Sequence, residues 1–270
     1  MSLSPAARDR RRVRRPVLAV TCAAWLALLL GDAMTRGPGG HAGGGVAGSA
    51  RATAPGVTTA GHGSMHAVTV HASDTSTITL TGFLSGWVLM VVAMMAPLLI
   101  PALRHVHARS LPRRRSWAMG VLTLGYVGTW VAAGLVLLML AVGVSAMADR
   151  AGGALLVGVV VAVSWQASPL RQRFLTRRRA LPPLAAFGRR AYLGALRFGL
   201  AHGAWCVGTC WAVMLLLLVV PARHVPLMVI VSLWLWGEEL ERPAGSGWGL
   251  RVPVGPLRIA GERALTGRGR

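Results

Sequence analysis

Six long apolar segments constrain the fold of this 270-residue chain more than any other feature of its sequence. A helix of roughly 17 to 25 apolar residues spans the hydrocarbon core of a bilayer, so the segments predict an all-α, polytopic bundle of about six transmembrane helices. Hydrophobic residues make up 54% of the chain and charged residues only 14%, which excludes an ordinary soluble domain. The third segment is long enough to tilt, or to break near one of its glycines. The segments are 16–34, 78–103, 118–147, 154–166, 193–221 and 225–236.

The positions of the arginines predict the orientation of this bundle. Short cytoplasmic loops of membrane proteins carry an excess of basic residues. Arginines cluster before the first segment, between the second and third, and between the fourth and fifth. The stretches between the other segments hold only Arg36, Arg51, Arg150 and Arg223. We therefore expect both termini to lie in the cytoplasm.

The segments divide the chain into four parts. Residues 1–34 form a basic N-terminus and the first helix, which could also be a signal peptide; the poor cleavage site around 31–34 favours a retained helix. Residues 35–77 form a flexible outer loop rich in Gly and His, and residues 78–240 form a five-helix membrane domain. Residues 241–270 form a basic tail that we expect to be disordered.

The charge and the cysteine content exclude several classes of function. The formal charge is +21, but all 29 basic residues are Arg, a bias that genomic base composition explains as well as a nucleic-acid partner does. Cys22, Cys206 and Cys210 are too few for a disulfide framework. The sequence has no Gly-rich phosphate loop, no Ser/His/Asp arrangement and no zinc-finger spacing. We expect no nucleic-acid binding and no enzymatic activity.

The fifth segment carries four possible metal ligands, His202, Cys206, Cys210 and Met214, at intervals of four residues. In a helix this spacing places them along one face as a slowly winding stripe. Polar side chains at membrane depth are functional candidates, although a lone His or Cys there can also serve only in packing. Because the donors are soft and carboxylates are absent, the stripe favours Cu(I) over Zn(II).

The second segment contains a cluster of thioethers. Met90 and Met94 share a helical face, Met95 is adjacent, and Pro97 is expected to kink the helix just beyond them. Methionines also fill gaps between helices, so the segment alone does not decide between packing and ligation. The methionines and the cysteines fall near the middle of their segments. If the two helices are neighbours, the soft donors meet at one depth of the membrane.

Polar residues outside the membrane have two interpretations. His41, His62, Met65, His66 and His71 of the outer loop could collect metal ions, or could belong to an ordinary flexible linker. At the end of the last segment, acidic side chains are expected to be solvated and paired with Arg. These acidic residues are Glu238, Glu239 and Glu241.

Three motifs together resemble a bacterial family of predicted metal-binding integral membrane proteins, known as domain of unknown function 2182. The first motif is Trp87-x-x-Met90-x-x-Ala93-Met94-Met95-x-Pro97. The second is Gln166-x-x-Pro169-Leu170-Arg171. The third is His202-Gly203-x-x-Cys206-x-Gly208-x-Cys210-Trp211-x-x-Met214. The resemblance extends from about residue 82 to residue 240 and implies metal binding by the Met, His and Cys residues of these motifs.

This chain departs from the family pattern at three places. Relatives have two adjacent cysteines where this chain has Thr209-Cys210. Many relatives also carry two cysteines in the cytoplasmic loop, where the matching residues here are Phe174 and Arg178. The usual Glu-Lys of the last helix is Glu238-Glu239. The chain therefore retains the membrane stripe and lacks a second, cytoplasmic thiol site.

We predict a multi-pass protein of the inner (plasma) membrane that binds a soft metal ion, most simply Cu(I), for transport, buffering or delivery. Met90, Met94, Cys206 and Cys210 are the proposed ligands. His202, Met95 and Met214 are secondary candidates. One alternative is a non-catalytic structural or assembly subunit that binds a membrane-protein partner. Another is a membrane subunit that holds a redox metal. The expected partners are the lipid bilayer and the metal ion.

Overall fold

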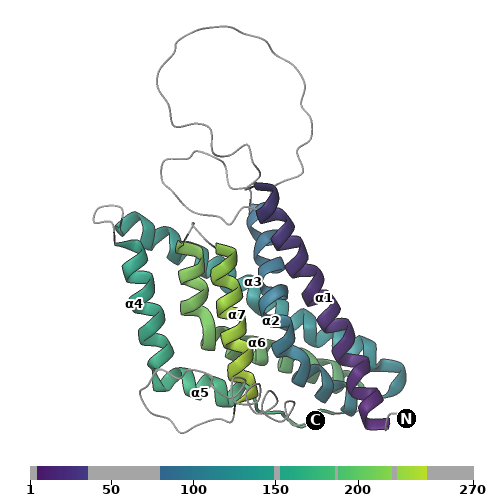
Figure 1. Cartoon of the computed structure of the whole chain (residues 1–270). Helices are drawn as coiled ribbons and strands as arrows, with labels where there is room; N and C mark the ends of the chain where they lie inside the picture. Colours follow the sequence, from purple (N-terminus) through teal and green to yellow (C-terminus); the bar gives the residue numbers. More distant parts are fainter. Residues whose placement is uncertain (1–4, 36–79, 149–152, 186–187, 221–223, 242–270) are drawn as a thin grey trace, which may run out of the picture.

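The computed structural model describes residues 5–35, 80–148, 153–185, 188–220 and 224–241, and these residues form helices without strands. Figure 1 shows the helices as an elongated bundle. The α-helices are α1 (Pro5–Thr35), α2 (Leu80–Arg109), α3 (Arg115–Ala148), α4 (Ala154–Ala167), α5 (Pro169–Arg178), α6 (Gly188–Val219) and α7 (His224–Leu240), and a 3₁₀ turn, η1 (Pro112–Arg114), precedes α3.

Each of the six predicted apolar segments corresponds to one helix of the structure. Four helical stretches are long and apolar enough to cross a membrane: Arg11–Met34, Leu80–Arg109, Pro112–Ala146 and Gly188–Val219. The helices α4 and α7 are shorter, with 14 and 17 residues. The predicted outer loop and C-terminal tail, including the loop His residues and Met65, lie outside the described residues apart from their first residues.

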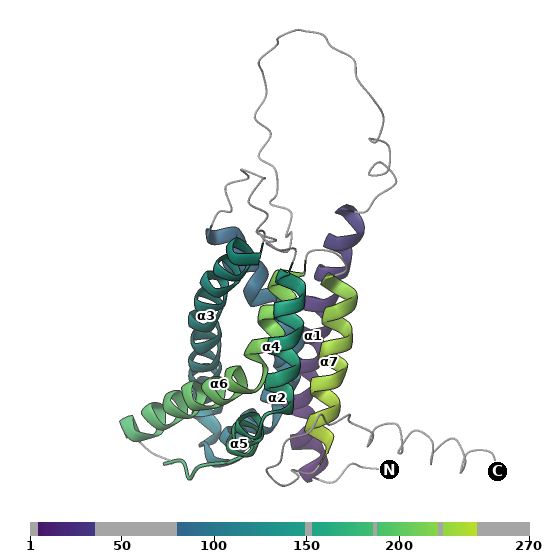
Figure 2. The ribbon, with the colours of Figure 1, turned by 90° about the vertical axis from the view of Figure 1, so that its left-hand side faces the viewer.

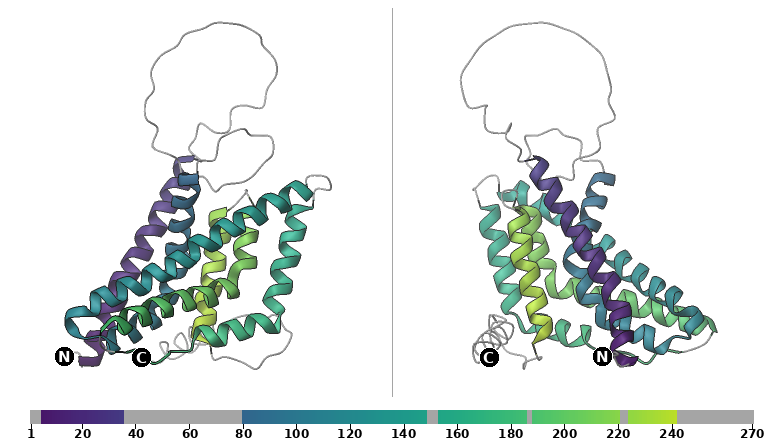
Figure 3. Two further views of the ribbon diagram at one scale, coloured as in Figure 1. Left: turned by 180° about the vertical axis from the view of Figure 1, so that it is seen from behind. Right: turned by 45° about the vertical axis from the view of Figure 1, so that its right-hand side comes forward.

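The long helices are continuous through their prolines and glycines. The helix α2 continues through Pro97 and Pro101, and α3 runs for 34 residues through its glycines. Transmembrane helices tolerate such residues because neighbouring helices satisfy the freed backbone groups. At 1.5 Å per residue α3 is about 50 Å long, well beyond the ~30 Å hydrocarbon core, and it lies inclined across the bundle (Figure 3).

The closest helix pair is α3 with α6, and small residues allow their approach. A Cβ atom added to Gly199 of α6 would lie 2.2 Å from the carbonyl oxygen of Leu122 of α3. A Cβ atom added to Gly203 would lie 2.9 Å from Cβ of Thr129. Ala195, Gly199 and Gly203 thus form a small-residue face of the kind that brings membrane helices together.

The second and fifth predicted segments, α2 and α6, do not pack along their lengths as the sequence analysis assumed. The helix α2 packs against α1, α3 and α7, whereas α6 packs mainly against α3, α4 and α5. Figure 2 shows α6 turning part-way, so that one part lies near α5 and the other stands behind α4. Side chains of α2 and α6 nevertheless belong to one buried apolar cluster.

The helix α5 lies in a segment that was predicted to be a loop. Its start is fixed by Ser168, whose Oγ accepts a hydrogen bond from the backbone N–H of Arg171 at 3.2 Å, and by Pro169 at the first helical position. Arg171 pairs with Glu238 and Arg178 pairs with Glu239, joining α5 to α7.

These ion pairs confirm the expected pairing of the glutamates with Arg, but Glu238 is buried rather than solvated. Glu238 and Arg178 are buried, and Arg171 is 2% exposed. Arg179 adds hydrogen bonds from Nη1 to the carbonyl oxygen of Glu241 at 2.8 Å and from Nη2 to that of Glu238 at 2.7 Å. The arginines therefore satisfy both the glutamate side chains and the carbonyl groups at the C-terminal end of α7.

Candidate metal centre

The stripe predicted in the fifth segment is buried along its whole length in α6. His202 is 5% exposed, and Cys206, Cys210 and Met214 are almost entirely enclosed. Both cysteines are free thiols, as expected for side chains one helical turn apart. The stripe lies beside the small-residue face, so the contact with α3 holds it at the interior of the bundle.

The predicted methionines of α2 belong to the same buried core as the cysteines. Met90 is buried, and Met94 and Met95 have no exposed surface. All three are part of one continuous apolar cluster that also contains Cys206, Cys210 and Met214. The backbone of Met94 is fixed by Trp236 of α7, whose Nε1 donates a hydrogen bond of 2.8 Å to its carbonyl oxygen.

The two thiols are held by a local hydrogen-bond network. The Sγ of Cys210 donates to the carbonyl oxygen of Cys206 at 3.0 Å, and Thr209 Oγ1 donates to the same oxygen at 2.6 Å. Tyr126 of α3 donates its hydroxyl to Cys206 Sγ at 3.3 Å. Thr209 therefore satisfies a backbone carbonyl group and does not extend the thiol pair.

His202 is surrounded by aromatic rings. Its ring centroid lies 5.9 Å from that of Tyr126 and 5.8 Å from that of Phe198. Backbone groups of Leu98 in α2 and Arg178 in α5 lie close to the imidazole. Within the described part of the chain, however, neither ring nitrogen makes a hydrogen bond of normal geometry. A buried imidazole with two unsatisfied nitrogens is costly, and a ligand would remove that cost.

Residues of α5 complete the surroundings of the stripe, and sequence reasoning placed them elsewhere. The ring of Phe174 packs so closely on Gly208 that an added Cβ atom would lie 2.5 Å from it. Arg178 interacts with the thiol of Cys206. Burial alone would lower the pKa of Arg178. Electrostatic interactions with Cys206 and, to a smaller extent, with Glu239 raise this pKa above its ordinary value. The guanidinium group is thus firmly charged.

The sequence analysis placed Phe174 and Arg178 in a cytoplasmic loop, whereas the structure places both in α5, against the stripe of α6. The signal that could have revealed this is the Ser168-Pro169 pair, a typical helix start within the presumed loop.

Donors from α4 and α5 also bind the backbone of the stripe. Trp165 Nε1 donates to the carbonyl oxygen of Gly208 at 3.0 Å, and Arg171 Nε donates to that of Thr209 at 3.2 Å. The ring of Trp165 meets that of Trp211 at 5.1 Å between centroids. The helical turn between the two cysteines is therefore held by donors from both α4 and α5.

Comparison with known families identifies a match over residues 84–259 to PpoB2, a family described as copper chaperone. The chain belongs to this copper chaperone family. The match begins before the methionines of α2 and includes the whole of α6. Comparisons with curated proteins and with solved structures found no match.

The donors of this copper chaperone family member suit copper better than harder ions. Among the described residues, no group of three or more His, Cys, Asp and Glu side chains is placed to hold a metal ion. A closed zinc site needs about four such ligands. Thiols and thioethers, in contrast, select Cu(I), which accepts few ligands. The buried cysteines and methionines belong to this class of soft donors.

Proposed function

We propose that this protein binds Cu(I) inside its helical bundle and holds it for transport, buffering or delivery, without catalysing a reaction. The observation that carries the proposal is His202, which is buried beside two free thiols with both ring nitrogens unsatisfied among the described residues. Membership of a copper chaperone family supports copper as the cargo.

Cys206 and Cys210 would supply the two thiolates, with thioethers from Met94, Met90 or Met214 beside them. His202 or Met95 would complete the ligand set when the ion moves along the stripe. Two thiolates and one Cu(I) carry one net negative charge, which is expensive to bury. Arg178, which interacts with Cys206, would balance that charge. Because position 209 is Thr and adds no third thiolate, the net charge of the loaded site together with Arg178 would be close to zero.

A multi-pass position in the inner membrane fits the distribution of charge. The arginine-rich ends of α1, α2, α3 and α6 lie at the end of the bundle that also holds α5 (Figures 1 and 3). This end would face the cytoplasm, as would both termini. The helix α5 would then cover the cytoplasmic side of the copper site.

The test is copper binding by the full-length protein in detergent. We would load the reduced protein with Cu(I) and measure its affinity by competition with a chromophoric Cu(I) chelator. Replacement of either buried thiol, as Cys206→Ser or Cys210→Ser, should weaken binding by about 10-fold or more, since it removes a ligand. Cys22→Ser is the matched control, because Cys22 is exposed on α1.

The outcome distinguishes metal binding from packing alone. Loss of affinity in both buried variants, with Cys22→Ser unchanged, supports the proposal. If the wild-type protein retains no copper, or if all three serine variants bind it equally, the cysteines only pack and the proposal is wrong.

A further inference from the structure

A second site lies away from the stripe, where the ends of three helices meet. A cavity of about 480 Å³ opens between the start of α1, the end of α2 and the start of α3. Its size falls within the range of typical small-molecule sites. The 3₁₀ turn Pro112–Arg114 joins α2 to α3 beside the cavity, and Pro112 is part of its lining.

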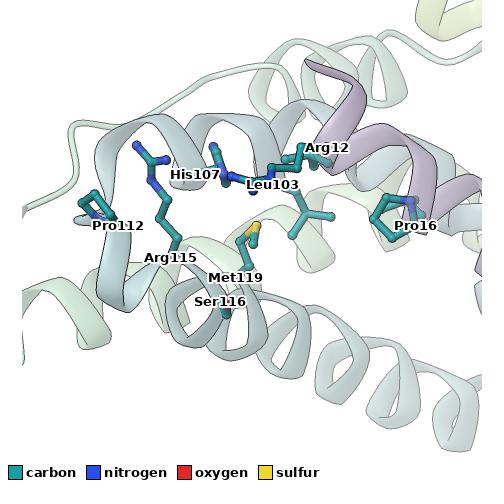
Figure 4. Close-up of a pocket in the computed structure, with 10 residues that line it drawn as sticks. Arg12, Pro16, Leu103, His107, Pro112, Arg115, Ser116 and Met119 are labelled. Carbon is teal, nitrogen blue, oxygen red and sulfur yellow. The ribbon is translucent and has the colours of Figure 1, made fainter. Parts of the chain in front are cut away.

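The lining of the cavity is cationic on one side and apolar on the other. Figure 4 shows the nitrogen-bearing side chains of Arg12, His107 and Arg115 gathered along one side, with Leu103 and Met119 across from them. Arg115 is held in place, since its Nε donates to the carbonyl oxygen of Ser110 at 3.2 Å. None of the described residues that line the cavity is acidic.

The position of the cavity along the bundle, and so its expected depth in a membrane, indicates the kind of ligand. Arg12 lies at the start of one candidate membrane span, His107 near the end of the next, and Arg115 near the start of the third. All three ends are at the basic end of the bundle. In a membrane they would lie at the level of the phospholipid head groups, where basic pockets between helices bind anionic lipids.

We propose that this cavity binds the phosphate group of an anionic phospholipid, with Arg12 and Arg115 on the phosphate and the apolar wall along the glycerol and upper acyl chain. Guanidinium groups match phosphate oxygens in geometry as well as in charge. A ligand with a charged head and an apolar body fits both sides of the lining. The inference requires the proposed membrane orientation but does not depend on copper binding.

The test measures lipid binding to the full-length protein in a neutral detergent at physiological salt. Native mass spectrometry would compare phosphatidylglycerol with phosphatidylcholine. Arg12→Gln with Arg115→Gln should lower the affinity for phosphatidylglycerol by about 25-fold, because each basic residue contributes about fivefold. The control, Arg15→Gln with Arg113→Gln, removes the same charge at exposed positions outside the cavity and should change the affinity much less.

Three results would overturn the proposal. The first is equal binding of the two lipids by the wild-type protein. The second is an equal loss in the two double variants, which would indicate general surface charge. The third is displacement of phosphatidylglycerol by millimolar inorganic phosphate, with phosphatidylglycerol binding no more tightly than inorganic phosphate. That result would assign the cavity to free phosphate. Thermal stability of each variant without lipid serves to identify any variant that fails to fold.

Discussion

The contact between α3 and α6 gives the sharpest prediction for the fold. In Gly199→Ala the new Cβ atom would lie 2.2 Å from the carbonyl oxygen of Leu122, whereas real Cβ atoms essentially never approach another atom within 3.0 Å. The obstacle is backbone, which cannot turn away as a flexible side chain can. The two helices must therefore separate locally by about 0.8 Å, the difference between these distances.

The expected cost of Gly199→Ala follows from that separation. A gap of 0.5–1 Å removes about a quarter to a half of the dispersion energy of each atom pair. For about 50 close atom pairs the total loss is about 2–4 kcal/mol. The higher helix propensity of Ala offsets about 1 kcal/mol of this. We expect a net decrease of about 1–3 kcal/mol in the free energy of unfolding, which is typical of overpacked contacts.

The assay is equilibrium unfolding of the purified protein in mixed micelles of mild and denaturing detergent. Gly194→Ala is the matched control on the same helix, because its Cβ atom would meet only a leucine methyl group at 3.6 Å. This control should be neutral or slightly stabilising. If Gly199→Ala and Gly194→Ala differ by less than about 0.5 kcal/mol, the reasoning from close packing is refuted.

Four further substitutions test the surroundings of the stripe. Tyr126→Phe removes the hydroxyl that donates to Cys206 Sγ and should lower Cu(I) affinity by about 10-fold in chelator competition; unchanged affinity would exclude a role for this bond. Arg171→Met leaves the buried Glu238 without its charged partner and should cost about 3–5 kcal/mol in detergent unfolding. Adding Glu238→Leu should restore most of that loss, and a double variant as unstable as Arg171→Met would contradict the ion-pair argument. Arg178→Met should weaken Cu(I) binding, because it leaves the net negative charge of the loaded site unbalanced; stronger binding would indicate that Arg178 repels the cation.

The sequence predicted the helices well because apolar length is a local property. All six apolar segments became helices, and the ends of the fourth, 154–166, agree with α4 to one residue. The stripe on α6 was equally predictable, since four-residue spacing follows from helix geometry alone.

The sequence did not predict which helices pack together. That choice depends on where two backbones can approach, as at Gly199 and Leu122, and such shape complementarity appears only in three dimensions. The helix α5 was missed because its arginines suggested a solvated loop. Two of these arginines, Arg171 and Arg178, are instead paired with Glu238 and Glu239, which lie about 60 residues further along the chain.

The position of α5 has a consequence for the speed of metal exchange. Phe174 packs on Gly208 between the two cysteines, and Arg178 interacts with Cys206, so neither position offers a further soft donor. If the site holds Cu(I) as proposed, an incoming acceptor would have few bonds to replace. The proposed site would therefore release its ion quickly, as delivery of copper to an acceptor requires.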